Sequence, residues 1–326
     1  MRAYFALVSP AMTTPSSSAG AAPRTDGRME GVLRAGHFAL TAEIAPPASA
    51  SAADLLAKAA SLKGLADAVN VTDGPGARAT MSPLVAAMKL LEAGIEPILQ
   101  MTCRDRNRIG LQSDLIGAAA LGIANVLLLR GDDPTAGDQP DAMPVFDLDA
   151  GSLLETAAGL RDRGELPSGR KVAGAAPFFL GAADVPIDPP PDWTPARLKA
   201  KIEAGAEFAQ TQINLDPALI ARYVARLAEH GVTEALHLIV GVAVPASARS
   251  ARWMRDHLFG TVVPDAVIDR LEQAADPRAE GVRIAVDMIQ ELAEMPGVAG
   301  AHIMAPLNER VIPRTIRDSG MLDRRV

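Results

Sequence analysis

The chain has 326 residues, of which 48% are hydrophobic and 22% charged, and its formal net charge is -7. These values are typical of a globular chain with a substantial core. The acidic balance and the 3% aromatic content argue against a nucleic-acid-binding protein, which needs a basic surface and stacking rings. No stretch reaches the roughly 20 apolar residues that a bilayer span requires, so we expect no membrane contact and a cytoplasmic location.

The first 30 residues differ from the rest of the chain. They contain a serine run at 16–18 and no hydrophobic periodicity, which predicts a disordered leader over 1–30 and a single folded domain over 31–326. Met12 and Met29 are alternative starting points, so an over-extended gene start is equally consistent with this composition.

From residue 37 onwards, short apolar runs alternate with longer segments rich in alanine, leucine and charged residues. This is the pattern of repeated βα units. The runs predict eight strands, at residues 38–44, 68–72, 95–102, 124–130, 171–176, 208–213, 236–242 and 300–304.

The segments between these strands have helical periodicity. Several end at a glycine, among them Gly94, Gly122, Gly205 and Gly231, as expected of helix C-terminal caps. Eight βα units without a GxGxxG motif favour a single (β/α)8 TIM barrel over a doubly wound sheet. The seventh unit is longer and carries an extra helical stretch over 264–275, so we predict two helices there. The other helices are predicted at 52–62, 83–93, 107–121, 153–163, 195–204, 217–230 and 278–295.

Polar residues recur where the predicted strands end, which is the active-site end of such a barrel. Buried ionisable groups are costly unless they are paired, so packing alone explains these residues poorly. Pairing with one another or helix capping remains the alternative interpretation, most directly for Asp132 in its turn and for Arg104, Asp105 and Gln212. The strand-end set includes Glu43, Thr72, Asp73, Gln100, Thr102, Arg104, Asp105, Arg130, Gly131, Asp132, Thr211 and Gln212. The single cysteine, Cys103, and five scattered histidines lack metal-ligand spacing, so we predict no metal site.

Taken in order, these strand ends resemble the methylenetetrahydrofolate reductase family, of the bacterial type that consists of the catalytic barrel only. The resemblance runs from about residue 37 to residue 310, and the order and spacing of its motifs make it specific. The motifs are AEIAPP at 42–47, VTDG at 71–74, QMTCRD at 100–105, LRGDDP at 129–134, KIEAGA at 201–206, QTQ at 210–212, GV at 241–242 and LN at 307–308.

The resemblance implies a flavoenzyme that interconverts 5,10-methylenetetrahydrofolate and 5-methyltetrahydrofolate, with FAD as cofactor and NADH or NADPH as co-substrate. By position, Glu43 is similar to the family's catalytic general acid, Asp132 to the aspartate beside flavin and folate, and Gln212 to the glutamine that contacts folate. The positions similar to those that line the flavin are Thr72, Gln100, Thr102, Arg130, Gly131, Asp132, Lys201 and Ala206.

The sequence also departs from the family pattern. Gln100 stands where the family often has a histidine. The segment read as following strand five, 176–180, lacks the tyrosine and histidine of many members, and the segment after strand seven, 245–249, lacks their phenylalanine. Two alternatives therefore stay open: a flavin-poor or partner-dependent subunit of the same family, and a non-catalytic folate-binding protein. We expect tetrahydrofolates and nicotinamide as partners, no nucleic acid, and a homo-oligomer, since barrels of this kind often pair through outer helices.

Overall fold

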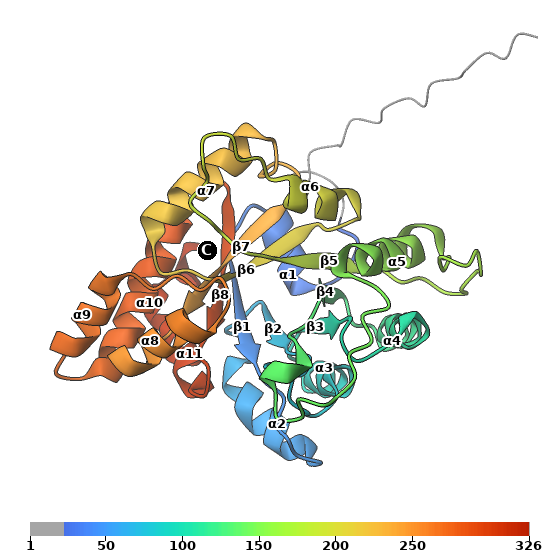
Figure 1. The fold of residues 1–326 in the computed structure, drawn as a ribbon, viewed down its shortest axis with the longest axis horizontal. Helices are drawn as coiled ribbons and strands as arrows, with labels where there is room; N and C mark the ends of the chain where they lie inside the picture. Colours follow the sequence, from blue (N-terminus) through green and yellow to red (C-terminus); the bar gives the residue numbers. More distant parts are fainter. Residues whose placement is uncertain (1–22, 326) are drawn as a thin grey trace, which may run out of the picture.

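The computed structural model describes residues 23–325, and its centre is a closed barrel of eight parallel strands in sequential order (Figure 1). The predicted (β/α)8 barrel is therefore confirmed. The strands are β1 (Ala39–Ile44), β2 (Ala68–Val71), β3 (Pro97–Thr102), β4 (Asn125–Leu129), β5 (Phe179–Asp184), β6 (Phe208–Ile213), β7 (His237–Ala243) and β8 (Val298–Met304).

Helices surround the strands, as parallel strands require when each connection returns to the same end of the barrel (Figure 1). The α-helices are α1 (Arg28–Arg34), α2 (Ala52–Ala59), α3 (Pro83–Glu92), α4 (Arg108–Ala120), α5 (Ala150–Arg163), α6 (Ala196–Glu203), α7 (Pro217–Glu229), α8 (Ala248–His257), α9 (Asp265–Gln273), α10 (Pro277–Ala293) and α11 (Ile312–Ser319). Short 3₁₀ turns are η1 (Ala60–Leu62), η2 (Pro134–Ala136), η3 (Glu309–Val311) and η4 (Asp323–Arg325).

Helix α7 shows how local sequence sets these elements. The Asp216 side chain accepts a hydrogen bond from the Leu219 backbone N–H at 3.0 Å, and Pro217 occupies the first turn, where its missing N–H costs nothing. Its buried residues recur at helical spacing from Ile220 to Leu227, so one face packs on the barrel. Gly231 follows the helix with φ +71°, as the predicted glycine cap requires.

Helix α1 closes the amino-terminal end of the barrel and lies across the centre of the strand ring in Figure 1. Its Met29 and Leu33 are buried in a cluster of inward-facing strand residues that includes Phe179 and Phe208. Those two rings stack with their centroids 5.0 Å apart. This apolar layer forms the floor of the barrel.

Ion pairs fasten α1 to the strands around that floor. Glu207, just before β6, pairs with Arg24 at 2.7 Å, Arg34 at 3.0 Å and Arg161 at 2.7 Å. Arg34 also pairs with Glu30 at 2.6 Å, within α1 itself.

Most of the predicted leader, residues 1–22, lies outside the described residues, whereas residues 28–30 form the first turn of α1.

Strand five lies further along the chain than predicted, so that prediction was wrong. Residues 171–176 do not form a barrel strand; Lys171 makes only an isolated antiparallel bridge to Glu165. The strand is Phe179–Asp184, paired with β4 on one side and β6 on the other. Residues 176–180 are therefore not its carboxyl end, which reads Ala183-Asp184 instead.

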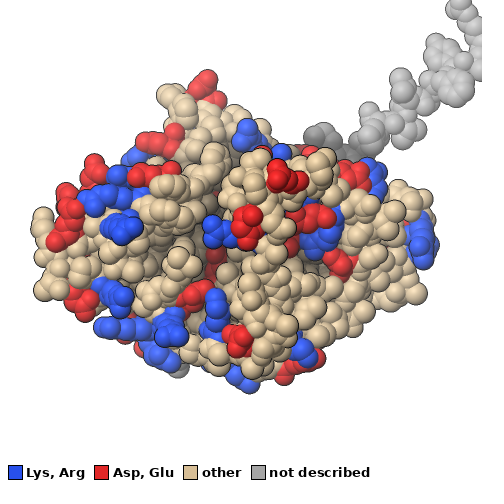
Figure 2. All heavy atoms as spheres, turned by 60° about the horizontal axis from the view of Figure 1, so that its bottom comes forward, with Lys and Arg blue, Asp and Glu red and all other residues tan. Residues whose placement is uncertain are grey.

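The seventh unit contains three helices, α8, α9 and α10, where two were predicted. The missed helix, α8, begins at a capping box in which Ser247 and Ser250 bond each other's backbone N–H. None of the helices among the described residues has the length and apolar character to cross a membrane. Figure 2 shows acidic and basic side chains interspersed over one face of the molecule.

Candidate functional site

The strand ends predicted to carry the chemistry gather on one face, because all eight strands of the closed barrel run in the same direction. Glu43 lies near the end of β1, Thr72 follows β2, Thr102 ends β3, and Gln212 lies near the end of β6. We call this carboxyl-terminal face the barrel mouth. It lies opposite the floor formed by α1.

Glu43 is the partly buried carboxylate of the mouth, with 27% of its side chain exposed. The Gln100 Nε2 donates a hydrogen bond to Glu43 Oε2 at 3.2 Å. The His302 Nε2 lies 3.5 Å from the same oxygen and comes from β8, the neighbour of β1. The structure thus brings together two residues predicted from the sequence, Glu43 and Gln100, and one that was not, His302.

Beneath Glu43, a layer of four polar side chains fills the inside of the barrel. Asn70 and Gln210 pair through two hydrogen bonds, of 2.5 Å and 3.0 Å. Gln210 Nε2 also donates to Thr41 Oγ1 at 3.1 Å, and Thr41 Oγ1 lies 2.9 Å from His302 Nδ1. All four side chains are buried. A TIM barrel normally fills this layer with branched aliphatic residues, so we name it the polar layer.

The polar layer was not predicted, because most of its residues lie deeper in the barrel than the strand ends. The signal was present as inward-facing polar residues two positions apart, since alternate residues of a strand share one face. The second residue of each pair lies one step nearer the mouth than the first. The pairs are Thr41 with Glu43, Asn70 with Thr72, Gln100 with Thr102, and Gln210 with Gln212.

Thr72 and Thr102 have different surroundings at the mouth. The Thr72 hydroxyl is buried and has no hydrogen-bond partner among the described residues. In contrast, Asp73 Oδ2 accepts hydrogen bonds from the Thr102 N–H at 2.8 Å and hydroxyl at 2.9 Å, and it also pairs with Arg106. An unpaired buried hydroxyl is costly, which marks Thr72 as a group available to a ligand.

The loop after β4 carries three predicted residues. The Arg130 guanidinium stacks on Phe146, 4.5 Å from the ring centroid. Gly131 has φ +92°, and a Cβ there would come within 2.9 Å of Thr102 Cβ, so glycine is required for this close approach. Asp132 is exposed, and its Oδ2 accepts a hydrogen bond from the Gly76 N–H at 2.8 Å.

Gln212 faces the connection between α8 and α9. Its Nε2 donates to the Phe259 carbonyl oxygen at 3.1 Å, and its Oε1 accepts from the Ile213 N–H at 2.8 Å. Phe259 itself is 86% exposed. The side chain of Gln212, which was predicted to contact folate, is therefore held at the edge of the mouth by the long seventh unit.

Lys201 lies beside the carboxyl end of β5, whereas Ala206 lies apart from the other predicted residues. Lys201, on α6, donates to the Ala183 carbonyl oxygen at 2.5 Å, and burial lowers the pKa of its ammonium group, although nearby Asp184 opposes that shift. Asp184 accepts a hydrogen bond from the Tyr223 hydroxyl at 2.6 Å. Ala206 lies on the turn before β6, at the amino-terminal end of the barrel, and the structure does not bring it to the mouth.

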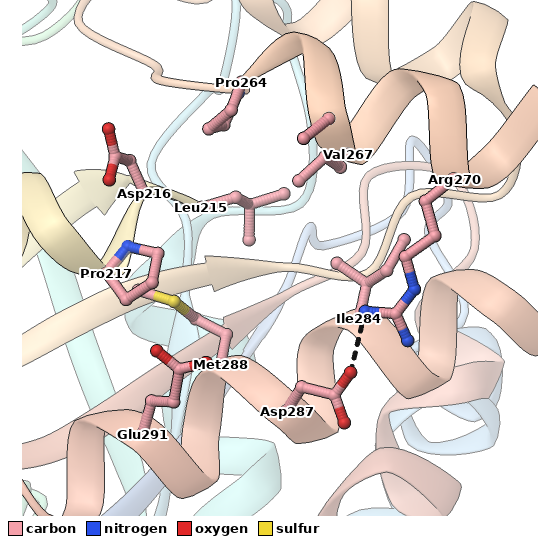
Figure 3. Close-up of a pocket in the computed structure, with 11 residues that line it drawn as sticks. Leu215, Asp216, Pro217, Pro264, Val267, Arg270, Ile284, Asp287, Met288 and Glu291 are labelled. Carbon is pink, nitrogen blue, oxygen red and sulfur yellow. Dashed lines mark ion pairs between the residues drawn. The ribbon is translucent and has the colours of Figure 1, made fainter.

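Two hollows flank the barrel. One, of about 320 Å³, lies between the loops after β2 and β3, beside the mouth, and its lining includes Asp73, Arg78, Arg104 and Arg106. The other, of about 340 Å³, lies outside the barrel between the start of α7 and helices α9 and α10 (Figure 3). The Arg270–Asp287 ion pair, at 2.7 Å, joins α9 to α10 across its edge.

Two comparisons of the sequence with known proteins agree on one family. The sequence model of the methylenetetrahydrofolate reductase family matches residues 28–320. "Methylenetetrahydrofolate reductase 2" of Schizosaccharomyces pombe is 28% identical over 263 residues, which cover 77% of this chain and 40% of that protein. A "probable methylenetetrahydrofolate reductase (NADPH)" of Caenorhabditis elegans is 24% identical over 252 residues, or 75% of this chain and 35% of that protein. This chain thus spans less than half the length of both relatives.

The fold is also found in solved structures of low sequence identity. One of them is an uncharacterized protein from Clostridium thermocellum, which binds two copies of 5-methyl-5,6,7,8-tetrahydrofolic acid. Its TM-score is 0.64 at 11% identity, and the alignment covers 91% of this chain and 100% of that one. At this identity the likeness concerns the fold alone.

Proposed function

Because the chain belongs to the methylenetetrahydrofolate reductase family, we propose that it interconverts 5,10-methylenetetrahydrofolate and 5-methyltetrahydrofolate with a nicotinamide as electron partner. The observation that carries this proposal is the placement of Glu43 at the barrel mouth, partly buried and bonded to Gln100. A general acid must be held where a substrate atom can reach it, and this carboxylate meets that condition.

In the proposed reaction, Glu43 holds a proton for the folate nitrogen as the five-membered ring opens. Gln100 fixes one carboxyl oxygen, Oε2, through its amide N–H. Gln212, at the edge of the mouth, would bind the folate. Because an enzyme lowers the barrier in both directions, the same groups serve the oxidation of 5-methyltetrahydrofolate.

The mouth also fits the FAD that the family implies. The buried Thr72 hydroxyl, which lacks a partner among the described residues, supplies a group to bind a ligand. We assign flavin binding to the residues on the adjacent ends of β2, β3 and β4, with Lys201 beside β5: Thr72, Gln100, Thr102, Arg130, Gly131, Asp132 and Lys201. Bound FAD would supply the hydride chemistry that no protein side chain provides. Charge from Asp132 near the flavin would adjust its potential.

The nicotinamide substrate is proposed from membership of the family and from the names of related proteins. The Caenorhabditis elegans relative is named as an NADPH enzyme, and the Clostridium thermocellum structure binds a methylated tetrahydrofolate. We propose NADH or NADPH as the second substrate, reacting at the same mouth as the folate. Ala206, at the opposite end of the barrel, is assigned to packing rather than to cofactor binding.

The test is an anaerobic absorption spectrum of the purified protein, followed by separate titrations with 5-methyltetrahydrofolate, NADH and NADPH. We expect a yellow protein that folate and at least one nicotinamide bleach. Glu43→Gln should slow the folate reaction at least about a hundredfold, the range of general acid–base catalysis, and leave nicotinamide bleaching nearly unchanged. Glu229→Gln, an exposed carboxylate on α7, is the matched control.

A colourless protein that takes up no FAD and responds to neither reagent would contradict the proposal. It would favour a flavin-poor or partner-dependent subunit of the family. Tight folate binding measured by calorimetry, without any flavin, would instead favour a non-catalytic folate-binding protein.

A further inference from the structure

We propose that His302 is a positioning residue for Glu43, held by the polar layer in the tautomer whose Nε2–H faces the carboxylate. This inference rests on the proposed function for its catalytic meaning. The arrangement of Thr41, Asn70, Gln210 and His302 that supports it is independent of any ligand.

The donors and acceptors of the polar layer can be assigned in sequence, starting from the Asn70–Gln210 pair. Gln210 Oε1 accepts from Asn70 Nδ2 at 2.5 Å, and Gln210 Nε2 donates to Asn70 Oδ1 at 3.0 Å. The second proton of the Gln210 amide points to Thr41 Oγ1 at 3.1 Å, and His302 Nδ1 lies 3.4 Å from the same nitrogen, so this contact also requires Nδ1 to accept. Since an amide nitrogen only donates, Thr41 Oγ1 must accept at its contact with Gln210.

The Thr41 hydroxyl then determines the tautomer of His302. Its own proton is free to donate to His302 Nδ1, which lies 2.9 Å away. A neutral imidazole that accepts at Nδ1 carries its proton at Nε2. That nitrogen lies 3.5 Å from Glu43 Oε2, and a movement of a few tenths of an ångström would complete a hydrogen bond, as catalytic contacts tighten on binding substrate.

The consequence concerns the two oxygens of Glu43. Gln100 Nε2 and His302 Nε2 both lie next to Oε2, at 3.2 Å and 3.5 Å. No hydrogen bond from a described residue reaches Oε1. When Glu43 is protonated, its proton therefore resides on Oε1, because Oε2 already faces two donors. The polar layer orients the acid so that its proton is presented to the mouth rather than to the barrel interior.

Burial makes this a specific arrangement rather than an incidental contact. His302 is 3% exposed and Thr41, Asn70 and Gln210 are equally inaccessible, so every missing partner would be costly. An aliphatic layer would serve packing at lower cost. If the polar layer had only a structural role, replacing His302 would affect both half-reactions alike. A positioning role predicts a loss in the folate half-reaction alone, and the two outcomes can be distinguished by measuring both rates.

The first experiment uses the flavin-loaded protein and compares its two half-reactions. His302→Leu should slow bleaching by 5-methyltetrahydrofolate at least about tenfold, the factor expected for a lost hydrogen bond to a charged group, and leave bleaching by the nicotinamide within about twofold. His302→Gln, whose amide N–H can occupy the Nε2 position, should recover most of the loss. Thr41→Val, which keeps the side-chain shape, should give an intermediate rate.

His237→Leu is the matched control. His237 begins β7, near the floor, where its ring lies 6.2 Å from that of Phe179, and it has no contact with Glu43. It should leave both half-reactions unchanged. Equal losses in both half-reactions for His302→Leu, or no recovery in His302→Gln, would overturn the positioning role.

The second experiment needs no catalysis. Nitrogen-15 spectra of histidine-labelled protein distinguish the two neutral tautomers, and the His302 signals are identified by their loss in His302→Gln. We expect a protonated Nε2 whose shift changes in Glu43→Gln, and a weaker preference for that tautomer in Thr41→Val, where Gln210 Nε2 remains near Nδ1 at 3.4 Å. A protonated Nδ1 in the wild-type protein would overturn the inference. If the wild-type protein fails to react with folate but shows the expected tautomer, the proposed function fails and the arrangement stands.

Discussion

Gln100 reaches Glu43 from β3 to β1, across the intervening strand β2, and its amide donates to the carboxylate at 3.2 Å. Replacement by methionine keeps the length of the side chain and removes the donor. We expect Gln100→Met to slow the folate half-reaction about tenfold, because a hydrogen bond to a charged group contributes about 1.5–3 kcal/mol. Stopped-flow absorbance measures the rate, and Gln290→Met, on the outer helix α10, is the control. An unchanged folate rate would remove Gln100 from the site.

The Asn70–Gln210 pair should show strong thermodynamic coupling. Asn70→Leu leaves the Gln210 amide buried with fewer partners, which costs about 1–3 kcal/mol beyond the change in packing. The double variant Asn70→Leu/Gln210→Met removes both polar groups and should cost less than the two single variants added together. Urea unfolding of all four proteins measures the coupling, and simple additivity would show that the two amides act independently.

Glu207 should be the most sensitive charge at the floor of the barrel. It is largely buried and pairs with three arginines, so Glu207→Ala removes one carboxylate from each of them, while Arg34 keeps Glu30 and Arg161 keeps Asp162. We expect a loss of about 2 kcal/mol in unfolding free energy, because hydrogen bonds to charged groups are lost at a largely buried site. Asp188→Ala, which breaks an exposed pair with Arg222, should cost less than about 1 kcal/mol. Equal losses in the two variants would contradict the assigned role of Glu207.

His237 should weaken the fold in mild acid. Burial, followed by the charge of Arg34, lowers its pKa to about 4, although Glu30 opposes the shift. Between about pH 6.5 and 4, the unfolded chain binds a proton at this site that the folded chain does not, so stability falls as pH falls through this window. The loss is at most about 3 kcal/mol. Urea unfolding at pH 7 and pH 5 should show a smaller decrease for His237→Leu than for wild type.

Cys103 should be inert while the protein is folded. Its side chain is buried, and desolvation raises the pKa of the thiol to about 11, so little thiolate exists at neutral pH. A disulfide exchange reagent should modify no thiol in the native protein at pH 8 and one thiol after addition of urea. Cys103→Ala should keep both half-reactions. Rapid modification of the folded protein would show that this strand end opens to solvent.

The fold could be predicted because most strands are recognisable in the sequence as apolar runs between helices that end at a glycine. Strand five was the exception. Its residues Phe179–Asp184 include Gly181, which has little strand preference, yet a Cβ there would lie within 2.4 Å of two Phe208 ring atoms. Glycine makes room for that ring inside the barrel. Tertiary packing, which local sequence does not contain, therefore decided the position of the strand.

The missed helix α8 has a similar explanation. Only Ala251 and Met254 are buried among its ten residues, and it packs mainly against α9. Its apolar stripe is too narrow for a helical period to stand out. The long seventh unit was recognised, but the number of its helices depended on contacts between segments distant in sequence.

The site was predictable where a residue is identified by its place at a strand end. Glu43, Gln100, Thr72 and Thr102 all lie at or beside the mouth, as expected from the direction of parallel strands. The contact between His302 and Glu43 was missed because Thr41 and Glu43 lie more than 250 residues before His302, so no local spacing reveals it. Its importance depends on barrel closure between β1 and β8.

The attachment of helix α1 has a consequence for the order of folding. Its partner Glu207 lies 173 residues beyond Arg34, and its floor includes residues from β1 through β7. A segment made early by the ribosome must therefore wait until most of the barrel has emerged before it can dock. Contacts of such long range also slow folding, since distant parts of the chain must first meet. Helix α1 is therefore expected to be among the last elements to reach its final place.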